Sequence, residues 1–265
     1  MIRIGLWSLV LCGSLSATEY FAKAEPVDTF SLKAAVNGEV LKVLESKEGK
    51  RSDGEVLIMI DDEVNRLELT ASQEKLHFLN ANIKLSKESV QNSLKAKKIA
   101  QESYARIKNL SSYSKVQKEA KIVSSITSTN SYIQAKSSLE NLKTQRSDLK
   151  LRIATLKNTI KKKNIHIKKD LYIYKIYPNV GDFVNMGSPL VDASDISQAR
   201  LTIYVTKEEL EGIEKKKIYI DDKVTNYKID KLWQVADSQN ISAYKVEIVI
   251  DKPKLFSMLM KVEFK

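Results

Sequence analysis

The chain has few of the residues that interrupt helices and few that bind metals. It holds 8 glycines and 4 prolines among 265 residues, so long stretches can stay helical without a break. Its two histidines, His77 and His166, lie far apart with no ligand pattern around them, which gives no indication of a metal site. The single cysteine, Cys12, lies in an apolar N-terminal run. If export removes this run, the mature chain has no disulfide, thiolate nucleophile or cysteine-ligated metal.

Paired acidic residues are present, but they do not indicate catalysis. Asp61–Asp62 and Asp221–Asp222 fall at the edges of expected strands and turns, where solvated acidic pairs are common. The methionines do not cluster in the sequence. We therefore expect no catalytic residue, no cofactor and no bound metal, and we interpret the chain as non-enzymatic.

The formal net charge of +11 indicates a solvated basic surface or an anionic partner, and not a nucleic-acid-binding protein. The lysines are spread along the chain and mixed with Glu and Ser, and the densest group is Lys161–Lys163 with Lys168 and Lys169. No zinc-finger spacing and no aromatic stacking motif accompanies them, so nucleic-acid binding is not indicated. The lysines either form a solvated face or attract anionic lipid or an acidic partner.

The N-terminus is typical of a secretory signal peptide. One basic residue precedes an apolar run at 4–17, and the small-residue pattern Ala22-Lys23-Ala24 follows. This predicts a signal peptide over residues 1–24, cleaved after Ala24, with Ala17 as the second choice. An uncleaved membrane anchor is the alternative, although the run is short for a spanning helix. A lipoprotein signal at Cys12 is disfavoured because a large residue precedes the cysteine.

The sequence period changes twice along the chain. Residues 25–61 show short strands and glycine turns, residues 62–164 contain no Gly or Pro and follow a helical period, and strand patterns return from 165. The segment 109–114 is short, polar and serine-rich, and it divides the helical part into two similar arms. The simplest fold is an antiparallel hairpin with its tip at 109–114, each arm reaching roughly 70 Å at ~1.5 Å per residue.

Heptad spacing predicts which faces of the two arms meet. In the first arm the expected seam consists of Leu69, Leu76, Ile83, Val90 and Tyr104, with Lys97 as the one polar exception in the series, and of Ser72, Leu79, Ser86, Ser93, Ala100 and Ile107 three residues after members of that series. In the second arm we expect one seam of Val116, Val123, Ile126 and Ile133, and after a phase shift another of Leu139, Leu142, Leu149, Ile153, Leu156 and Ile160. So many small and polar members bury little apolar area. They either permit close helix approach or indicate that hairpins pack side by side in an oligomer, and the second interpretation is favoured.

The segments on either side of the hairpin repeat one order of elements. Each has a strand, a turn between two glycines and a second strand: Gly49 and Gly54 mark the first turn, Gly181 and Gly187 the second. The repeat suggests two halves of one small β module, formed by residues 25–61 and 165–195, and the strands of 196–265 follow it.

In this order of elements the chain resembles the HlyD-type periplasmic adaptor proteins, also called membrane fusion proteins. The half-motifs that carry the resemblance run from Gly38 to Asp61 and from Val180 to Leu190, followed by Asp195-Ile196-Ser197 and Leu201 to Val205. The resemblance implies an α+β fold: a split lipoyl-like (barrel-sandwich) domain, an inserted coiled-coil hairpin and a small β-barrel domain. A glycine usual after the hairpin is missing between 166 and 176, and the family's further membrane-proximal domain looks absent.

The resemblance also implies a function and its partners. Such a protein links an inner-membrane transporter of the RND or ABC type to an outer-membrane TolC-like channel, acts in the periplasm and forms a ring, expected to be hexameric. Arg106, Leu110 and Ser114 match the order of the family's tip residues that engage the channel, with a shorter spacing from Leu to Ser. The chemistry of these residues suits a contact without the family as well, since Arg has a fixed donor fork, Leu offers an apolar contact and Ser can cap the returning helix. The alternative is a plain helix turn with a solvated Arg and an ordinary N-cap. A lipoyl- or biotinyl-type carrier subunit is a second hypothesis, disfavoured because neither turn holds a lysine-centred motif, and a membrane-tethered coiled-coil scaffold is a third.

Overall fold

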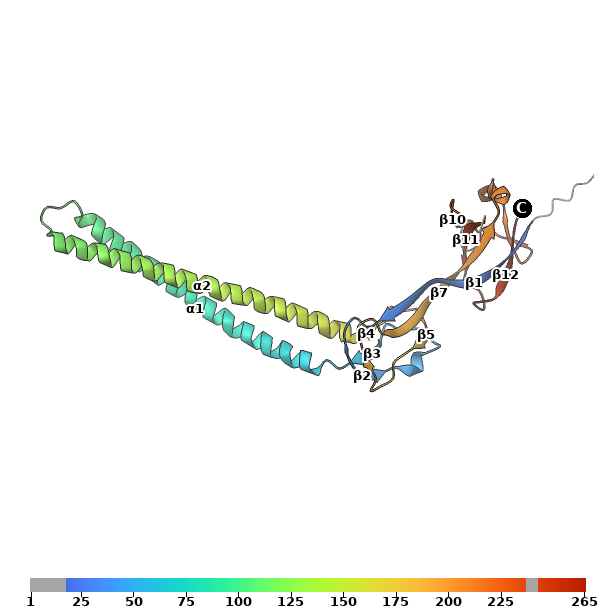
Figure 1. The fold of residues 1–265 in the computed structure, drawn as a ribbon, viewed down its shortest axis with the longest axis horizontal. Helices are drawn as coiled ribbons and strands as arrows, with labels where there is room; N and C mark the ends of the chain where they lie inside the picture. Colours follow the sequence, from blue (N-terminus) through green and yellow to red (C-terminus); the bar gives the residue numbers. More distant parts are fainter. Residues whose placement is uncertain (1–17, 237–242) are drawn as a thin grey trace, which may run out of the picture.

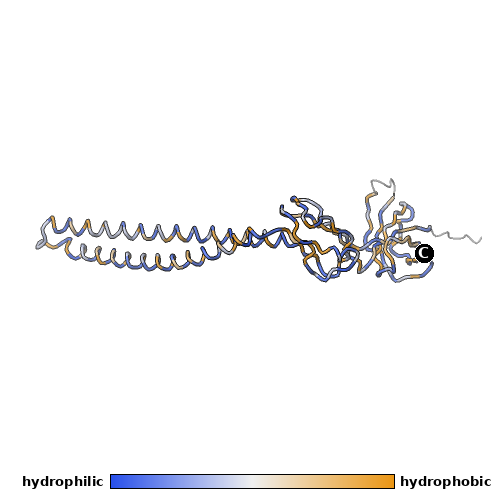
Figure 2. The backbone as a smooth tube through the Cα atoms, turned by 90° about the horizontal axis from the view of Figure 1, so that it is seen from below, coloured by the Kyte–Doolittle hydropathy of each residue, from blue (hydrophilic) through white to orange (hydrophobic). Residues whose placement is uncertain are grey.

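The computed structural model describes residues 18–236 and 243–265. Two long helices project from two β units that follow one another along the molecule, as Figure 1 shows. This arrangement confirms the predicted α+β class. In the perpendicular view of Figure 2 the two helices again lie side by side along their length. No helix of the residues described here is long and apolar enough to cross a membrane.

The two helices occupy the part of the sequence without glycine and proline. Helix α1 (Glu63–Ile107) has 45 residues and α2 (Lys115–Lys163) has 49, so each is about 70 Å long at ~1.5 Å per residue. They run antiparallel and contact each other along their length, with α2 returning from the tip to the β units. Neither helix is interrupted by a kink-forming residue.

The strands form two sheets. The smaller sheet has the order β4-β3-β2-β6, and the larger has the order β10-β11-β7-β1-β12-β8-β9 with β5 paired to β7. The strands are β1 (Glu19–Lys33), β2 (Gly38–Val43), β3 (Val56–Ile60), β4 (Asn164–His166), β5 (Tyr172–Ile176), β6 (Phe183–Val184), β7 (Pro189–Val205), β8 (Ile218–Ile220), β9 (Lys223–Val224), β10 (Ile229–Leu232), β11 (Tyr244–Asp251) and β12 (Leu259–Phe264). A single helical turn, α3 (Lys207–Leu210), follows β7.

The segments before and after the hairpin share one hydrophobic core, and we call them together the split β unit. Val40, Leu57 and Ile58 come from the first segment, and Ile173 and Leu190 from the second, and all are at most 1% exposed. A close backbone approach explains the glycine that opens β2. A Cβ added at residue 38 would lie 2.5 Å from a methyl carbon of the Ile60 side chain, so only glycine fits there without a shift.

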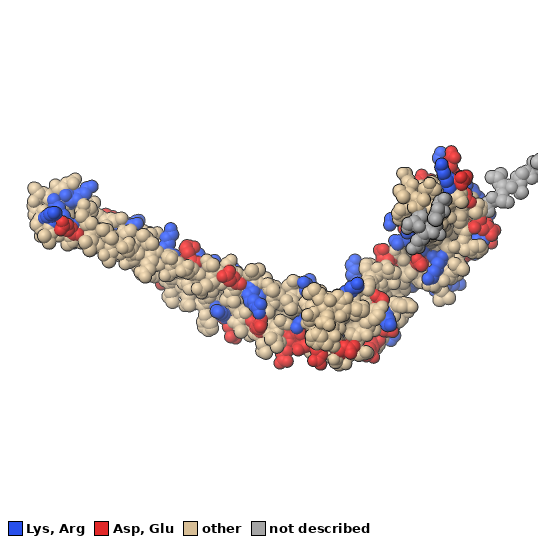
Figure 3. Space-filling view, in the orientation of Figure 1, with Lys and Arg blue, Asp and Glu red and all other residues tan. Residues whose placement is uncertain are grey.

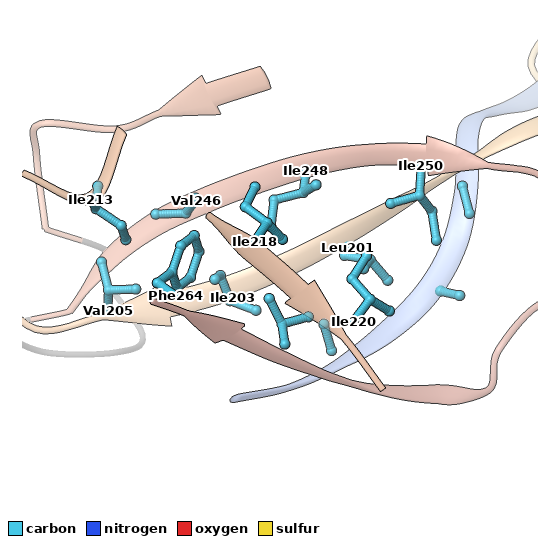
Figure 4. Packing of buried hydrophobic residues seen from close by; sticks show 14 residues of the cluster. Leu201, Ile203, Val205, Ile213, Ile218, Ile220, Val246, Ile248, Ile250 and Phe264 are labelled. Carbon is cyan, nitrogen blue, oxygen red and sulfur yellow. The ribbon is translucent and has the colours of Figure 1, made fainter. Parts of the chain in front are cut away.

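The C-terminal β unit has its own core inside a curled sheet, shown in Figure 4. Leu201 and Val205 of β7, Val246 and Ile248 of β11 and Ile218 of β8 point into it and are at most 2% exposed. Burial of such side chains contributes roughly 1.5–3 kcal/mol each to folding. The unit is therefore a folded body separate from the core of the split β unit.

Strands β1 and β7 run through both β units and join them. They pair from Ala24↔Leu201 in the C-terminal unit to Lys33↔Pro189 in the split unit. Between Pro26 and Asp28 the register shifts, because four positions of β7 are spanned by two of β1. The predicted domain boundary after residue 195 falls inside β7, so the two units share strands instead of being connected by a linker. We call this shared, bulged part of the ribbon the elbow.

The start of β1 corrects the predicted processing site. Ala22 and Ala24 are buried in the C-terminal core and pair with β12 and β7. Burial alone would raise the pKa of Glu209, but hydrogen bonds from Thr18, Tyr20 and Thr206 lower it to about 2. The bonds from Thr18 and Tyr20 also hold the start of β1 in place. Cleavage after Ala24 would remove this part of the core, so that prediction is wrong. The rest of the predicted signal peptide, 1–17, lies outside the described residues.

Candidate partner-binding surfaces of the hairpin

The tip of the hairpin is a short, well-capped turn. The Ser114 Oγ accepts a hydrogen bond from the Gln117 backbone N–H at 3.3 Å, and the Gln117 Oε1 accepts one from the Ser114 backbone N–H at 2.9 Å. This reciprocal cap satisfies two donors at the start of α2 that have no partner within the helix. At the other side of the turn, the Leu110 N–H donates to the Ile107 carbonyl at 3.1 Å. The backbone of the tip is therefore fixed by local bonds.

The side chains of the tip face solvent. Leu110 is 46% exposed and Tyr113 is 40% exposed, although both are large and apolar. The Arg106 guanidinium lies 3.8 Å from the Glu102 carboxylate, and both side chains are more than 65% exposed. Such an exposed i,i+4 pair stabilises a helix by at most about 0.5 kcal/mol, so Arg106 is easily released to another partner.

The structure thus places Arg106, Leu110 and Ser114 together at the end of the molecule farthest from the C-terminal β unit (Figure 1). Ser114 has a structural role as a helix cap. Tyr113 was missed by the sequence reasoning, which treated it as one letter of a polar turn. The presence of an aromatic residue in a serine-rich segment was the signal that could have identified Tyr113.

The net positive charge of the protein lies on the hairpin, because acidic residues are few there. Residues 63–163 contain 21 Lys and Arg against 8 Asp and Glu, a net charge of +13 in a chain of +11. The part nearest the tip, residues 94–122, has eight basic and two acidic side chains. Figure 3 shows Lys and Arg at the tip with few acidic residues among them. A surface of this kind favours an acidic partner.

The base of the hairpin is held by a partly buried carboxylate. Asp62 precedes α1 and accepts two hydrogen bonds of 2.7 Å from the Arg66 guanidinium and one of 3.1 Å from the Asn164 amide. The Arg66 bonds hold the pKa of the Asp62 carboxyl below its usual value, although burial opposes them. The Lys163 ammonium donates to the Asp61 carbonyl at 2.5 Å. Both helices are thereby fastened to the split β unit where they meet it.

The proximal half of the hairpin, nearer the β units, uses the predicted seams. Leu79 and Ile83 of α1 pack with Leu139 of α2 and are 3–8% exposed, and Ile153 and Leu156 continue the contact. Arg152 and Glu68 form an ion pair across the two helices. The predicted seam of α1 is buried or half-buried at each of its positions. The predictions for α1 and for the second part of α2 are confirmed.

In the distal half, nearer the tip, the predicted seam of α2 is wrong. Val116, Val123, Ile126 and Ile133 face solvent and are 55–73% exposed. The face that meets α1 is instead the polar one, made by Lys118, Ile122, Ser125, Ser128, Thr129, Tyr132 and Ala135. The Lys97 ammonium lies over the Tyr132 ring at 5.1 Å within this seam. The four outward residues at 116, 123, 126 and 133 form what we call the outer stripe.

Helix α1 has an exposed apolar stripe of its own. Phe78, Leu85 and Ile99 are 63–67% exposed and repeat at multiples of seven residues. Each stands one position before a seam residue, whereas Val123, Ile126 and Ile133 of the outer stripe each stand one position after a seam residue of α2. Because the helices are antiparallel and one residue turns the helix by ~100°, the two stripes lie on opposite faces of the hairpin. Each hairpin therefore exposes apolar side chains on both faces.

Elsewhere the charged side chains pair with one another in ways that support the fold. Glu247 is 3% exposed, and its carboxylate lies within 4.0 Å of Arg200, Lys231 and Lys245. Within residues 18–236 and 243–265, no group of three or more His, Cys, Asp or Glu side chains is arranged to hold a metal ion. On the hairpin, the exposed surfaces that suit a partner are the tip and the two stripes.

No protein-family model and no curated protein matches the chain. Solved structures do match its fold. MacA from Actinobacillus actinomycetemcomitans superposes with a TM-score of 0.73 at 16% identity, covering 94% of this chain and 78% of that one. The membrane fusion protein Spr0693 from Streptococcus pneumoniae has a TM-score of 0.58 at 11% identity, over 94% of this chain and 98% of that one.

A putative efflux transporter from Bacteroides eggerthii has a TM-score of 0.53 at 13% identity, covering 94% of this chain and 68% of that one. The match with MacA and Spr0693 includes both the hairpin and the β units, since it spans nearly the whole chain. These likenesses confirm the resemblance stated from the sequence at the level of the fold: the chain has the fold of the membrane fusion, or periplasmic adaptor, proteins.

Proposed function

We propose that the chain is a periplasmic adaptor that links an inner-membrane transporter to an outer-membrane TolC-like channel in an efflux or type I-like secretion pump, without catalysing a reaction. The observation that carries the proposal is a capped tip with exposed Arg106, Leu110 and Tyr113, held about 70 Å from two β units. A long projecting arm with local bonds at its tip suits contact with a distant partner. The likeness in fold to MacA and Spr0693 supports the same role.

In this proposal the split β unit is the lipoyl-like domain and the C-terminal unit is the β-barrel domain. The β units associate with the transporter of the inner membrane, either RND or ABC in type. The chain reaches the periplasm by an N-terminal signal, cleaved no later than residue 17, because β1 begins at Glu19 and belongs to the C-terminal core.

Lateral association of hairpins follows from the two exposed stripes. Ile99 of α1 and Val123 of α2 lie at similar distances from the tip, since the chain turns between them at residues 109–114. Side-by-side hairpins can therefore set the α1 stripe of one copy against the outer stripe of the next. Such a contact is not self-complementary, so repeated addition gives a ring when the rotation between copies closes, and we propose a hexameric ring.

Crosslinking tests the ring. A variant carrying both Ile99→Cys and Val123→Cys should form a ladder of crosslinked species in cells when the pump partners are present, ending at the closed ring. The pair Gln101→Cys with Lys121→Cys is the control, because these exposed positions lie at matching distances from the tip but off both stripes. Equal ladders from both pairs would refute the assigned contact.

Transport in cells tests the tip. Leu110→Asp and Arg106→Glu should abolish transport while leaving expression, export and thermal melting unchanged, because an exposed turn contributes little to folding. The matched controls are Leu151→Asp and Lys84→Glu, which make the same chemical changes at exposed positions far from the tip. Normal transport by both tip variants at native expression would overturn the proposed role of the tip.

A further inference from the structure

The elbow between the two β units contains a groove of about 800 Å³. We propose that this groove binds a small amphipathic anion, a molecule with an aromatic or acyl body and one carboxylate, sulfonate or phosphate group. Ligand binding at this groove is separate from the adaptor role, which needs only the hairpin and the β units that hold it. A volume of several hundred Å³ matches the usual size of small-molecule sites in proteins.

The groove has apolar walls from both β units. The split unit contributes Tyr174 of β5 and Phe30 of β1, which are 71% and 39% exposed. The C-terminal unit contributes Leu255, 71% exposed, and Phe256. Tyr172 is a fourth aromatic residue of the lining, and four aromatic rings and a leucine around one space would be covered by a flat or chain-like apolar body. Exposed apolar side chains gathered around one concave space indicate a binding site more strongly than single exposed ones do.

The charges at the groove select the sign of the ligand. Lys252 and Lys254 line it, and among the carboxylates of the described residues none lies within ion-pairing distance of either ammonium. The one acidic residue in the lining, Asp192, already accepts a hydrogen bond of 2.5 Å from the Tyr177 hydroxyl. Two free ammonium groups beside an apolar surface complement an anionic head on an apolar body.

The wall that carries the lysines is preformed. The Ser257 N–H donates to the Ala24 carbonyl at 2.8 Å, and the Ala24 N–H donates to the Met258 carbonyl at 2.9 Å. Ser257 itself has a positive φ of 64°, which turns the chain back toward β12. The backbone at this end of the groove is therefore in place before a ligand binds.

Because of its position, the groove can connect ligand binding to the angle between the two β units at the elbow. Its walls lie on either side of the register shift between Pro26 and Asp28, where β1 and β7 pass from one unit to the other. A ligand that contacts Tyr174 and Leu255 together would hold the two units at one angle. The site thus joins ligand binding to the direction in which the hairpin points.

Fluorescence titration of the purified chain tests the site. The probe is 1-anilinonaphthalene-8-sulfonate, which has an aromatic body and one sulfonate, and its uncharged analogue N-phenyl-1-naphthylamine tests the role of charge. We expect saturable binding of the anionic probe at one site, at least tenfold weaker in Lys252→Glu/Lys254→Glu. Leu255→Ser should weaken both probes about fivefold. The control Lys223→Glu/Lys228→Glu changes the same charge at exposed positions of the same unit and should bind normally.

Thermal melts of each variant keep the result interpretable, because the dye also binds unfolded surfaces. Equal binding by groove and control variants of unchanged melting temperature would overturn the proposal. So would equal affinity for the uncharged analogue. Binding to anionic phospholipid vesicles without binding of the monomeric probe would also overturn it, since the surface would then recognise a membrane. None of these outcomes bears on transport by the tip variants, so the groove and the adaptor role fail separately.

Discussion

The proximal and distal halves of the hairpin differ in the side chains that fill the seam between the two helices. Near the β units, Leu79, Ile83 and Leu139 meet between the helices and are almost fully buried. Near the tip, Ser125 and Tyr132 lie in the seam while Ile126 and Ile133 face water. The proximal seam therefore contributes more to the stability of the hairpin. In the distal half the apolar side chains of α2 stay available for other chains, as Phe78 and Leu85 of α1 do in the proximal half.

The difference shows that a heptad pattern locates an apolar stripe without saying which way it points. The direction is set by the partner helix and by the base of the hairpin, where Asp62 and Asn164 fix how the two helices begin and end. Along α2 the seam keeps one register, since Ser125, Tyr132 and Leu139 follow one another at intervals of seven residues, and in the distal part the large apolar residues stand outside it.

The largest expected effect concerns the proximal seam. Leu139→Ala should lower the free energy of unfolding by about 2–4 kcal/mol, because it leaves a cavity between tightly packed side chains. Ile133→Ala, on the outer stripe, should change it by less than ~0.5 kcal/mol. Urea denaturation followed by circular dichroism measures both. Similar losses for the two variants would mean that the halves do not differ in this way.

The next effect concerns the anchor of the proximal half. Asp62→Asn should cost about 1–2 kcal/mol at neutral pH, since the charge-assisted bonds from Arg66 are weakened. The folded pKa of Asp62 is lowered, so its contribution is present above the unfolded pKa of ~3.9 and is lost as pH falls through the folded value. Melting temperatures between pH 6 and pH 2 should therefore fall less steeply in the variant. A parallel decline in the two proteins would contradict this role.

A substitution in the distal seam should make this seam more apolar, as the proximal seam is. Ser125→Leu places an apolar side chain in a half-buried seam position and should raise the free energy of unfolding by about 1 kcal/mol. Ser124→Leu, one position round the exposed surface, is the control and should leave it nearly unchanged. Chemical denaturation of the purified variants decides. Destabilisation by Ser125→Leu at unchanged helicity would show that the distal seam has no room for a larger residue.

The smallest effect concerns the contact of Lys97 with Tyr132. Lys97→Met keeps the length of the side chain but removes the charge over the ring, and should cost about 0.5 kcal/mol. Lys98→Met, at an exposed neighbouring position, should cost less. High-precision thermal melts are needed, and an equal cost at the two positions would indicate helix propensity instead of a cation–π contact.

Local patterns in the sequence were sufficient for the helical period, the seam of α1 and the position of the tip residues. They gave a wrong prediction where the same residue pattern fits two different structures. Ala22-Lys23-Ala24 fits a cleavage site, but its alternation is also that of a strand with Ala22 and Ala24 buried and Lys23 exposed. The elbow groove was out of reach for a different reason, because its walls come from segments that are distant in sequence and meet only through the pairing of β1 with β7.

The shared strands give the molecule the mechanics of a lever. Because β1 and β7 continue from one β unit into the other, the units cannot slide past each other, and the register shift at the elbow is where the ribbon bends most easily. A rotation of about 5° there would displace the end of a 70 Å arm by about 6 Å, close to one helical turn. Small changes near the membrane side would thus become movements at the tip large enough to make or break a contact.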